Sequence, residues 1–247
     1  MLPNSRHCME WEPRLVSRVR SVCLYAATRG KLSLFWNGHT AFGICHALRR
    51  VCTMIPAFGL NGVLPPFVGV TPADTRGVSP YRTTMTEIAK VLATSPERVK
   101  LCKGLLAHRR ALRDLGVTTG VQWIDGSFCE NVEAALGRAP GDIDVVTLMR
   151  RPPAHESGPA WQSLVTQNLR VFDRVATKHH YSCDAFFVDL HQPTAAIVQQ
   201  VTYWFGLFTH QKATRLWKGI LQVPIVSDDD AADALLNTSP GPLLHIP

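Results

Sequence analysis

Two aspartates close together, Asp142 and Asp144, are the residues of this chain best suited to chemistry. They open the apolar run DIDVVTL, which predicts a β-strand. Residues two apart on a strand point to the same side, so both carboxylates are expected to project together. Two like charges in that position repel each other unless solvent or a cation separates them. A hard divalent ion, Mg²⁺ or Mn²⁺, would resolve the repulsion because such ions prefer carboxylate oxygens.

A third carboxylate from a neighbouring strand would complete a site for two metal ions. The later run CDAFFVDL, which also predicts a strand, supplies Asp184 and Asp189 as candidates. An odd separation places these two side chains on opposite faces of the strand, so both cannot serve. We favour Asp184, which precedes the apolar segment, and leave Asp189 open as the alternative.

Gly126 and Ser127 follow the apolar strand VQWID and precede a short helix expected around residues 130–136. Glycine lets the backbone approach a phosphate closely, because it has no Cβ. The serine hydroxyl and the amides that follow can donate hydrogen bonds to phosphate oxygens. The stretch therefore predicts a phosphate cradle beside the metal-binding pair. Each signal alone is common, since Gly-Ser turns and solvated strand-edge acids abound, and it is their order along the chain that favours a site.

That order resembles the nucleotidyltransferase superfamily typified by DNA polymerase β and the small minimal nucleotidyltransferases. The shared pattern is an apolar strand, Gly-Ser, a spacer, Asp-x-Asp and an acid on a later strand. Gly126, Ser127, Asp142 and Asp144 match it, with Asp184 in the later position. The spacer is longer here than in the family, with 14 residues between Ser127 and Asp142.

The stretch from about residue 54 to 225 also resembles an uncharacterised bacterial family of such proteins that carries only a domain-of-unknown-function label. The resemblance rests on segments such as SPER, W.DGSF.E, RAPGDIDVVT, D.F.VDL and KGIL. It implies a mixed sheet flanked by helices and transfer of a nucleoside monophosphate from a nucleoside triphosphate, with release of pyrophosphate. Asp142, Asp144 and Asp184 would bind metal and act in catalysis, and Gly126 with Ser127 would hold the triphosphate. The acceptor stays open: a protein hydroxyl, a small molecule or an RNA end.

A non-catalytic binding or antitoxin-like module on the same fold, working through a toxin–antitoxin partner, is the alternative function. A sugar-nucleotide transferase that uses Asp-x-Asp differently is less favoured, because the Gly-Ser element precedes the acidic pair. Lys212, Arg215 and Lys218 fall in a predicted loop, which is expected to be solvated or to reach a triphosphate.

The elements that must position these residues alternate between helix and strand, which predicts an α/β or α+β protein with a mixed sheet. The best-marked helix starts after Ser95 as N-cap with Pro96 in its first turn, and ends at Gly116. Its Lys and Arg side chains are expected to form a solvated face. Further helices are predicted over 83–94, in 160–177 and over 194–208, a last edge strand in WKGILQVP and an acidic helix in DDDAADALL.

The net charge of +7 comes almost entirely from the first 53 residues. These hold eight Lys and Arg against two acids, and the remainder holds 18 against 17. A basic groove along a long nucleic acid is therefore not indicated for residues 54–247, the predicted nucleotidyltransferase-like domain. The seven cysteines show no CxxC pair, which favours a reducing cytoplasm, and no segment is apolar for long enough to span a membrane.

Residues 1–53 form a predicted basic extension that differs in style from the chain after Met54. Three interpretations stay open: a genuine extension, which could be disordered, an accessory helical pair, or an upstream stretch translated from a start codon assigned too early.

Overall fold

The computed structural model describes residues 55–238. The predicted extension over residues 1–53 lies outside the described residues, as do residues 239–247. In the described part, no helix is both long and apolar enough to cross a membrane.

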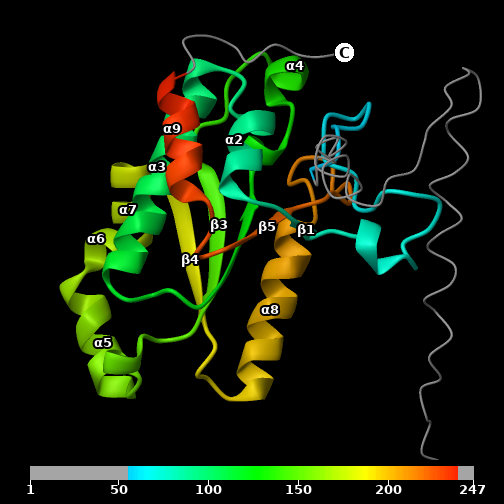
Figure 1. The fold of residues 1–247 in the computed structure, drawn as a ribbon. Coiled ribbons are helices and arrows are strands. Elements are labelled where there is room, and N and C mark those ends of the chain that lie inside the picture. The colour runs from blue at the N-terminus through cyan, green and yellow to red at the C-terminus, as the bar shows by residue number, and fades with distance from the viewer. Residues whose placement is uncertain (1–54, 239–247) are drawn as a thin grey trace, which may run out of the picture. The chain divides into compact units, whose positions relative to one another are not determined.

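The described residues form a five-stranded mixed sheet in the order β1-β5-β2-β3-β4 (Figure 1). The strands are β1 (Tyr81–Arg82), β2 (Gly120–Asp125), β3 (Ile143–Met149), β4 (Cys183–Asp189) and β5 (Leu221–Pro224). β2 runs antiparallel to both of its neighbours, whereas β3 and β4 are parallel, as are β1 and β5. β5 therefore lies inside the sheet, and its prediction as an edge strand is wrong because β1 pairs with its outer side.

Eight α-helices accompany the sheet in the part of the chain described. They are α2 (Met85–Leu92), α3 (Pro96–Asp114), α4 (Val132–Leu136), α5 (Gly158–Gln167), α6 (Leu169–Phe172), α7 (Arg174–Tyr181), α8 (Thr194–Phe208) and α9 (Asp229–Thr238). Short 3₁₀ turns add η1 (Thr75–Gly77), η2 (Ser127–Cys129) and η3 (Pro153–His155). A mixed sheet flanked by helices confirms the predicted α+β class.

Successive side chains along the strands point to opposite faces of the sheet, and different helices pack against each face. Ile124, Val145 and Ala185 belong to the larger core, together with buried residues of α2, α3 and α9. Trp123 and Val146 belong to a second core, to which α8 contributes. Figure 1 shows α8 set apart from α2, α3 and α9, in agreement with these two cores. The strands thus carry helices on both faces.

Helix α3 begins as predicted, with the Ser95 side chain accepting a hydrogen bond from the Arg98 amide at 3.3 Å. The prediction that all its cations are solvated is wrong, because Arg98 and Arg109 are buried. Arg98 donates to Glu133 on α4 and to the backbone carbonyls of Phe128 and Glu130, which precede that helix. A buried guanidinium is tolerated when its donors are satisfied in this way.

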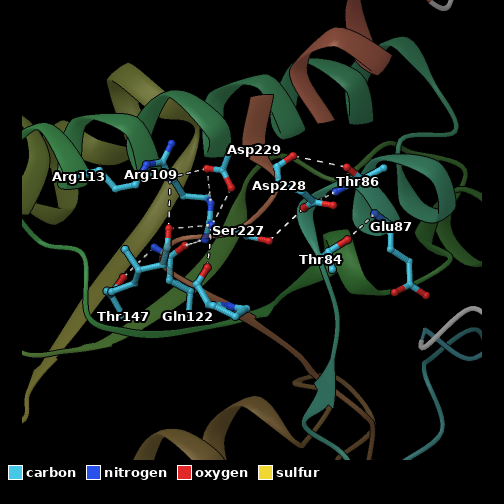
Figure 2. A network of polar contacts seen from close by, with 12 residues as sticks. Thr84, Thr86, Glu87, Arg109, Arg113, Gln122, Thr147, Ser227, Asp228 and Asp229 are labelled. Carbon is cyan, nitrogen blue, oxygen red and sulfur yellow. Dashed lines mark hydrogen bonds and ion pairs between the residues drawn. The ribbon is translucent and has the colours of Figure 1, made fainter. Parts of the chain in front are cut away.

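Arg109 is the centre of a buried polar network that ties α3 to the sheet and to α9 (Figure 2). Its guanidinium donates to Asp229 at 2.8 and 2.9 Å and to the Gln122 side chain at 2.6 Å. Gln122 in turn donates to the Thr147 hydroxyl on β3 at 3.0 Å. Nearby, Asp228 accepts a hydrogen bond from the Thr86 amide at the start of α2. The start of α9 is therefore fixed to two helices and two strands.

The single helix expected within 160–177 is instead three helices, α5, α6 and α7. The chain leaves the helical conformation at Asn168 and at Asp173. Asp173 caps α7 by accepting a hydrogen bond from the Ala176 amide at 2.9 Å. After this break, α7 places Arg174 and Lys178 beside the acids at the starts of β3 and β4.

Candidate functional site

Three aspartates lie in a row across neighbouring strands. Asp144 on β3 is paired with Asp184 on the parallel β4, and with Asp125 on the antiparallel β2. Directly paired residues point to the same face of a sheet. Asp142 directly precedes β3 and is two residues from Asp144, so it belongs to that face as well. Four carboxylates therefore gather where β2 ends and where β3 and β4 begin.

Asp144 stands out in this group because no cation neutralises it at close range. Among the described residues, no hydrogen bond or ion pair within 4.0 Å reaches its carboxylate, although Asp125, Asp142 and Asp184 each have a cationic partner. Burial, together with the charges of Asp142 and Asp184, raises the pKa of Asp144 to about 6, although the more distant Lys218 and Lys178 act in the opposite direction. Asp144 thus faces two like charges without an ion pair of its own, which is the arrangement that a bound cation would relieve.

Helix α7 supplies the cations that pair with Asp142 and Asp184. The Arg174 guanidinium donates to both oxygens of Asp184, with Nε–Oδ1 and Nη2–Oδ2 distances of 2.5 and 2.7 Å. Lys178 Nζ lies 2.6 Å from Asp142 Oδ2 and 3.9 Å from Asp184 Oδ2. The hydrogen bond to Asp142 raises the pKa of Lys178, and that to Asp184 raises the pKa of Arg174.

Lys218 is the buried cation of the site. It is 2% exposed, so the expectation of a solvated side chain is wrong at this residue. Its ammonium lies 2.9 Å from Asp125 and 2.6 Å from Glu130. Burial opposes the lysine charge, but Asp125 and Glu130 together raise its pKa. Burial raises the pKa of Asp125 to about 7 in spite of Lys218.

The Gly126–Ser127 turn lies directly against Asp144. Gly126 has φ +80°, and a Cβ at this position would come 2.0 Å from Asp144 Oδ2. Only glycine fits there, because both the backbone conformation and the carboxylate exclude a side chain. Ser127 starts the 3₁₀ turn η2, and its hydroxyl makes no hydrogen bond to any described residue. The hydroxyl is therefore available to a ligand next to the acids.

The sequence left two candidates for the third acid, and the structure separates them. Asp184 is the strand partner of Asp144, whereas Asp189 pairs with Met149 at the opposite end of β4. Asp189 forms an ion pair with Arg151 there, at 2.6 Å. The structure brings Asp142, Asp144, Asp184, Gly126 and Ser127 together and leaves Asp189 out.

The donor set fits a hard divalent cation in part. Carboxylate oxygens are the preferred ligands of Mg²⁺ and Mn²⁺, and Asp144 is an acid without a cation. Among residues 55–238, no group of three or more His, Cys, Asp or Glu side chains is arranged to hold a metal. Asp142 and Asp184 are engaged by α7 instead, so metal binding by all three acids requires these ion pairs to open.

Three residues of the site, Asp125, Arg174 and Lys178, have no role predicted from the sequence, and Lys218 is expected there only in a loop that is solvated or reaches a triphosphate. Asp125 ends the strand before Gly126, and its register with Asp144 follows only once β2 and β3 are paired. Arg174 and Lys178 had a weak signal in their i, i+4 spacing after the capping residue Asp173. Lys218 is 74 residues beyond Asp144, and no local pattern marks it as buried.

An α+β protein with an acidic site at one end of a mixed sheet is the class that fold and site define. A family model, described as Family of unknown function (DUF6932), matches residues 56–224. The chain belongs to this family, as the predicted uncharacterised family over about 54–225 anticipates. No curated protein and no solved structure matches the chain. The kinship with nucleotidyltransferases stays a prediction.

Proposed function

We propose that this chain is a Mg²⁺- or Mn²⁺-dependent nucleotidyltransferase that moves a nucleoside monophosphate from a nucleoside triphosphate to an acceptor hydroxyl. The observation that carries the proposal is the strand register of Asp144 with Asp184 beside the Gly126 turn. It combines carboxylates for a metal with a close backbone approach for a phosphate, and both are needed for phosphoryl transfer. The cytoplasm stays the expected location, and the acceptor stays open.

Each residue has a distinct role in this proposal. Asp142, Asp144 and Asp184 would hold the divalent ions, which supply activation of the attacking oxygen and charge neutralisation of the leaving group. The Gly126–Ser127 turn, which packs against Asp144, would hold the triphosphate, with the Ser127 hydroxyl donating to one of its oxygens. Asp184 faces the acceptor and takes the proton from its hydroxyl. The acceptor oxygen then bonds to the α-phosphorus, the bond to the bridging oxygen breaks, and pyrophosphate leaves.

Lys218 and Asp125 would act beneath the reacting groups as positioning residues. Their buried ion pair fixes the end of β2, and hence the Gly126 turn, against Asp144. A site held by packed strands and a buried ion pair loses little freedom when substrate binds, which favours catalysis.

The test is incubation of the purified full chain with Mg²⁺ or Mn²⁺ and each labelled nucleoside triphosphate in turn. The readouts are pyrophosphate release and transfer of label to the chain or to added RNA and small-molecule acceptors. We expect activity that Asp142→Ala with Asp144→Ala abolishes and that Asp189→Asn, at the far end of β4, retains. Label transfer that survives the double substitution would refute the proposal.

The alternative, a non-catalytic module with a toxin–antitoxin partner, predicts a different result for the wild-type and doubly substituted chains. A partner encoded by a neighbouring gene would bind the wild-type chain and the Asp142→Ala, Asp144→Ala chain equally well, without pyrophosphate release from either.

A further inference from the structure

Arg174 and Lys178 lie one turn apart on α7, and both lie within 4.0 Å of Asp184, with Lys178 also paired to Asp142. We propose that these two side chains are the polyphosphate-binding residues of the site, and that they exchange their carboxylate partners for phosphate oxygens when a divalent cation binds Asp142, Asp144 and Asp184. This inference rests on the proposed function and names the part of the substrate that α7 recognises.

Their position on the correct face of the sheet is the first argument. The Arg174 guanidinium lies 5.0 Å from the ring centre of Phe186, which is two residues after Asp184 on β4. Residues two apart on a strand share a face, so Arg174 extends over the same face that carries the acids. Lys178 follows at i+4 and reaches Asp142 across the starts of β3 and β4.

The second argument is the contrast in exposure between the two sides of each ion pair. The side chains of Arg174 and Lys178 are 61% and 55% exposed, whereas those of Asp184 and Asp142 are 6% and 21% exposed. The acids are held at the starts of β3 and β4, whereas the cations lie largely in solvent and can turn away from them. A pocket of about 370 Å³ lies beside them, lined by Arg174, Val175, Lys178 and His179. The cations therefore have a place to receive a second anionic partner.

The third argument is charge. Three acids face two α7 cations, which leaves the cluster formally one charge negative and Asp144 without a cation. A divalent ion on these acids removes the reason for Arg174 and Lys178 to stay on them, and like charges then drive the cations from the metal. A polyphosphate bound to the same metal brings the negative charge that both cations need. Arg and Lys are well suited to it, Arg through a bidentate contact and Lys as a point charge.

Two binding measurements test the exchange without relying on turnover. The full-length proteins are wild type, Arg174→Gln, Lys178→Gln and, as a matched control, Arg150→Gln, an exposed arginine just after the far end of β3. The first measurement is Mn²⁺ binding by electron paramagnetic resonance without any phosphate. The second is calorimetric binding of inorganic tripolyphosphate in excess Mg²⁺, which does not depend on the base.

Removing either α7 cation should tighten Mn²⁺ binding severalfold, because a competitor for the carboxylates is lost. The same variants should bind magnesium tripolyphosphate about tenfold to a hundredfold more weakly, the loss expected for one charged hydrogen-bonding group. Arg150→Gln should change neither value. The opposite signs of the two effects distinguish exchange from general damage, and thermal unfolding followed by circular dichroism checks that each variant is folded.

Variants that bind magnesium tripolyphosphate as tightly as wild type overturn the α7 proposal and leave the proposed function standing. Weaker Mn²⁺ binding in both variants also overturns it, since the cations would then be supporting the acids instead of competing with metal. A wild-type chain that binds neither Mn²⁺ nor magnesium tripolyphosphate overturns both proposals together.

Discussion

Asp144 is the strand partner of Asp184 and lies two residues from Asp142, and the described residues offer it no cation within ion-pair distance. Its charge must be relieved by a proton or by an added cation. The raised pKa of about 6 corresponds to relief by a proton, and the proposed metal site corresponds to relief by a cation. Proton binding and metal binding can both be measured through substitutions of Asp144.

The pH dependence of stability should therefore change when Asp144 is replaced by Asn. Above the ordinary carboxyl pKa of 3.8 the unfolded chain ionises, whereas folded Asp144 keeps its proton until about pH 6. The folded state then binds more protons, so this residue makes stability fall as the pH rises through that window. Without divalent cations, we expect Asp144→Asn to be more stable than wild type by roughly 2 kcal/mol at pH 8, and to lose this advantage toward pH 4.

Urea unfolding from pH 4 to pH 8 in the presence of a chelator measures this difference. Asp114→Asn, at the exposed end of α3, is the matched control for loss of one acid. If the unfolding free energies of wild type and Asp144→Asn differ by the same amount at every pH, the raised pKa of Asp144 is contradicted.

Asp184 and Asp189 lie on the same strand, β4, and their substitutions can be compared for their effect on Mn²⁺ affinity. Asp184→Asn removes the strand partner of Asp144, so Mn²⁺ binding should weaken by more than about tenfold. Asp189→Asn removes the partner of Arg151 at the far end of β4 and should leave Mn²⁺ binding unchanged. Titration of Mn²⁺ into both variants decides the matter, and equal affinities would exclude Asp184 as a ligand.

At the scale of an element, the turn after β2 places the Gly126 backbone directly against the Asp144 carboxylate. Gly126→Ala should cost roughly 1–3 kcal/mol of stability and weaken Mn²⁺ binding, because the new Cβ displaces the Asp144 carboxylate. Gly137→Ala is the control, since φ there is +63° but no atom lies within 4 Å of the added Cβ. It should cost roughly 1 kcal/mol and leave binding intact. Similar Mn²⁺ affinities for both variants would mean that the turn does not support Asp144.

Most elements follow from local sequence signals. The Ser95-Pro96 start of α3, the apolar runs of β2, β3 and β4, and the bounds of α8 are each predicted from residues inside the element. The same holds for the core of the candidate site, because an i, i+2 pair on a strand shares a face whatever the rest of the chain does. The break at Asp173 is missed, because apolar residues continue through it at helical spacing.

The electrostatic partners of the site do not follow from local signals. Arg98, Arg109 and Lys218 look like surface residues in sequence, and only pairing with distant acids makes their burial tolerable. Arg174 reaches Asp184 only after the break at Asp173 has redirected α7. Such contacts depend on strand order, which a single sequence does not specify.

At the scale of the whole molecule, the polar network around Arg109 joins helices and strands that are distant in the chain (Figure 2). Arg109→Met should cost roughly 3–5 kcal/mol of stability, because it leaves Gln122 buried without its donor and Asp229 with Arg113 alone. Arg110→Met, one residue on and exposed, should change stability by less than about 0.5 kcal/mol. Urea unfolding of both variants measures the contrast. A small effect at Arg109 would show that the network can be replaced by packing.

Helix α9 lies beyond the family match, which ends at residue 224, yet it belongs to the same core. Ala232 and Leu236 are buried against the residues of α2 and α3, and Asp229 holds Arg109 and Arg113. A chain that stops after Ile225 loses all of these contacts and leaves the Arg109 guanidinium buried without its carboxylate. It should therefore be destabilised by at least as much as Arg109→Met, roughly 3–5 kcal/mol.

A chain that stops after Thr238 is the control, since it keeps α9 and every described contact. Thermal and urea unfolding of the two shortened chains should show a wild-type transition for the longer one and a strongly weakened or absent transition for the shorter one. Equal transitions would mean that residues 56–224, which match the family model, fold without α9. The position of the acids at the starts of β3 and β4 would then not depend on this helix. We expect the opposite, because Gln122, which precedes Asp125 on β2, depends on Arg109 and through it on Asp229.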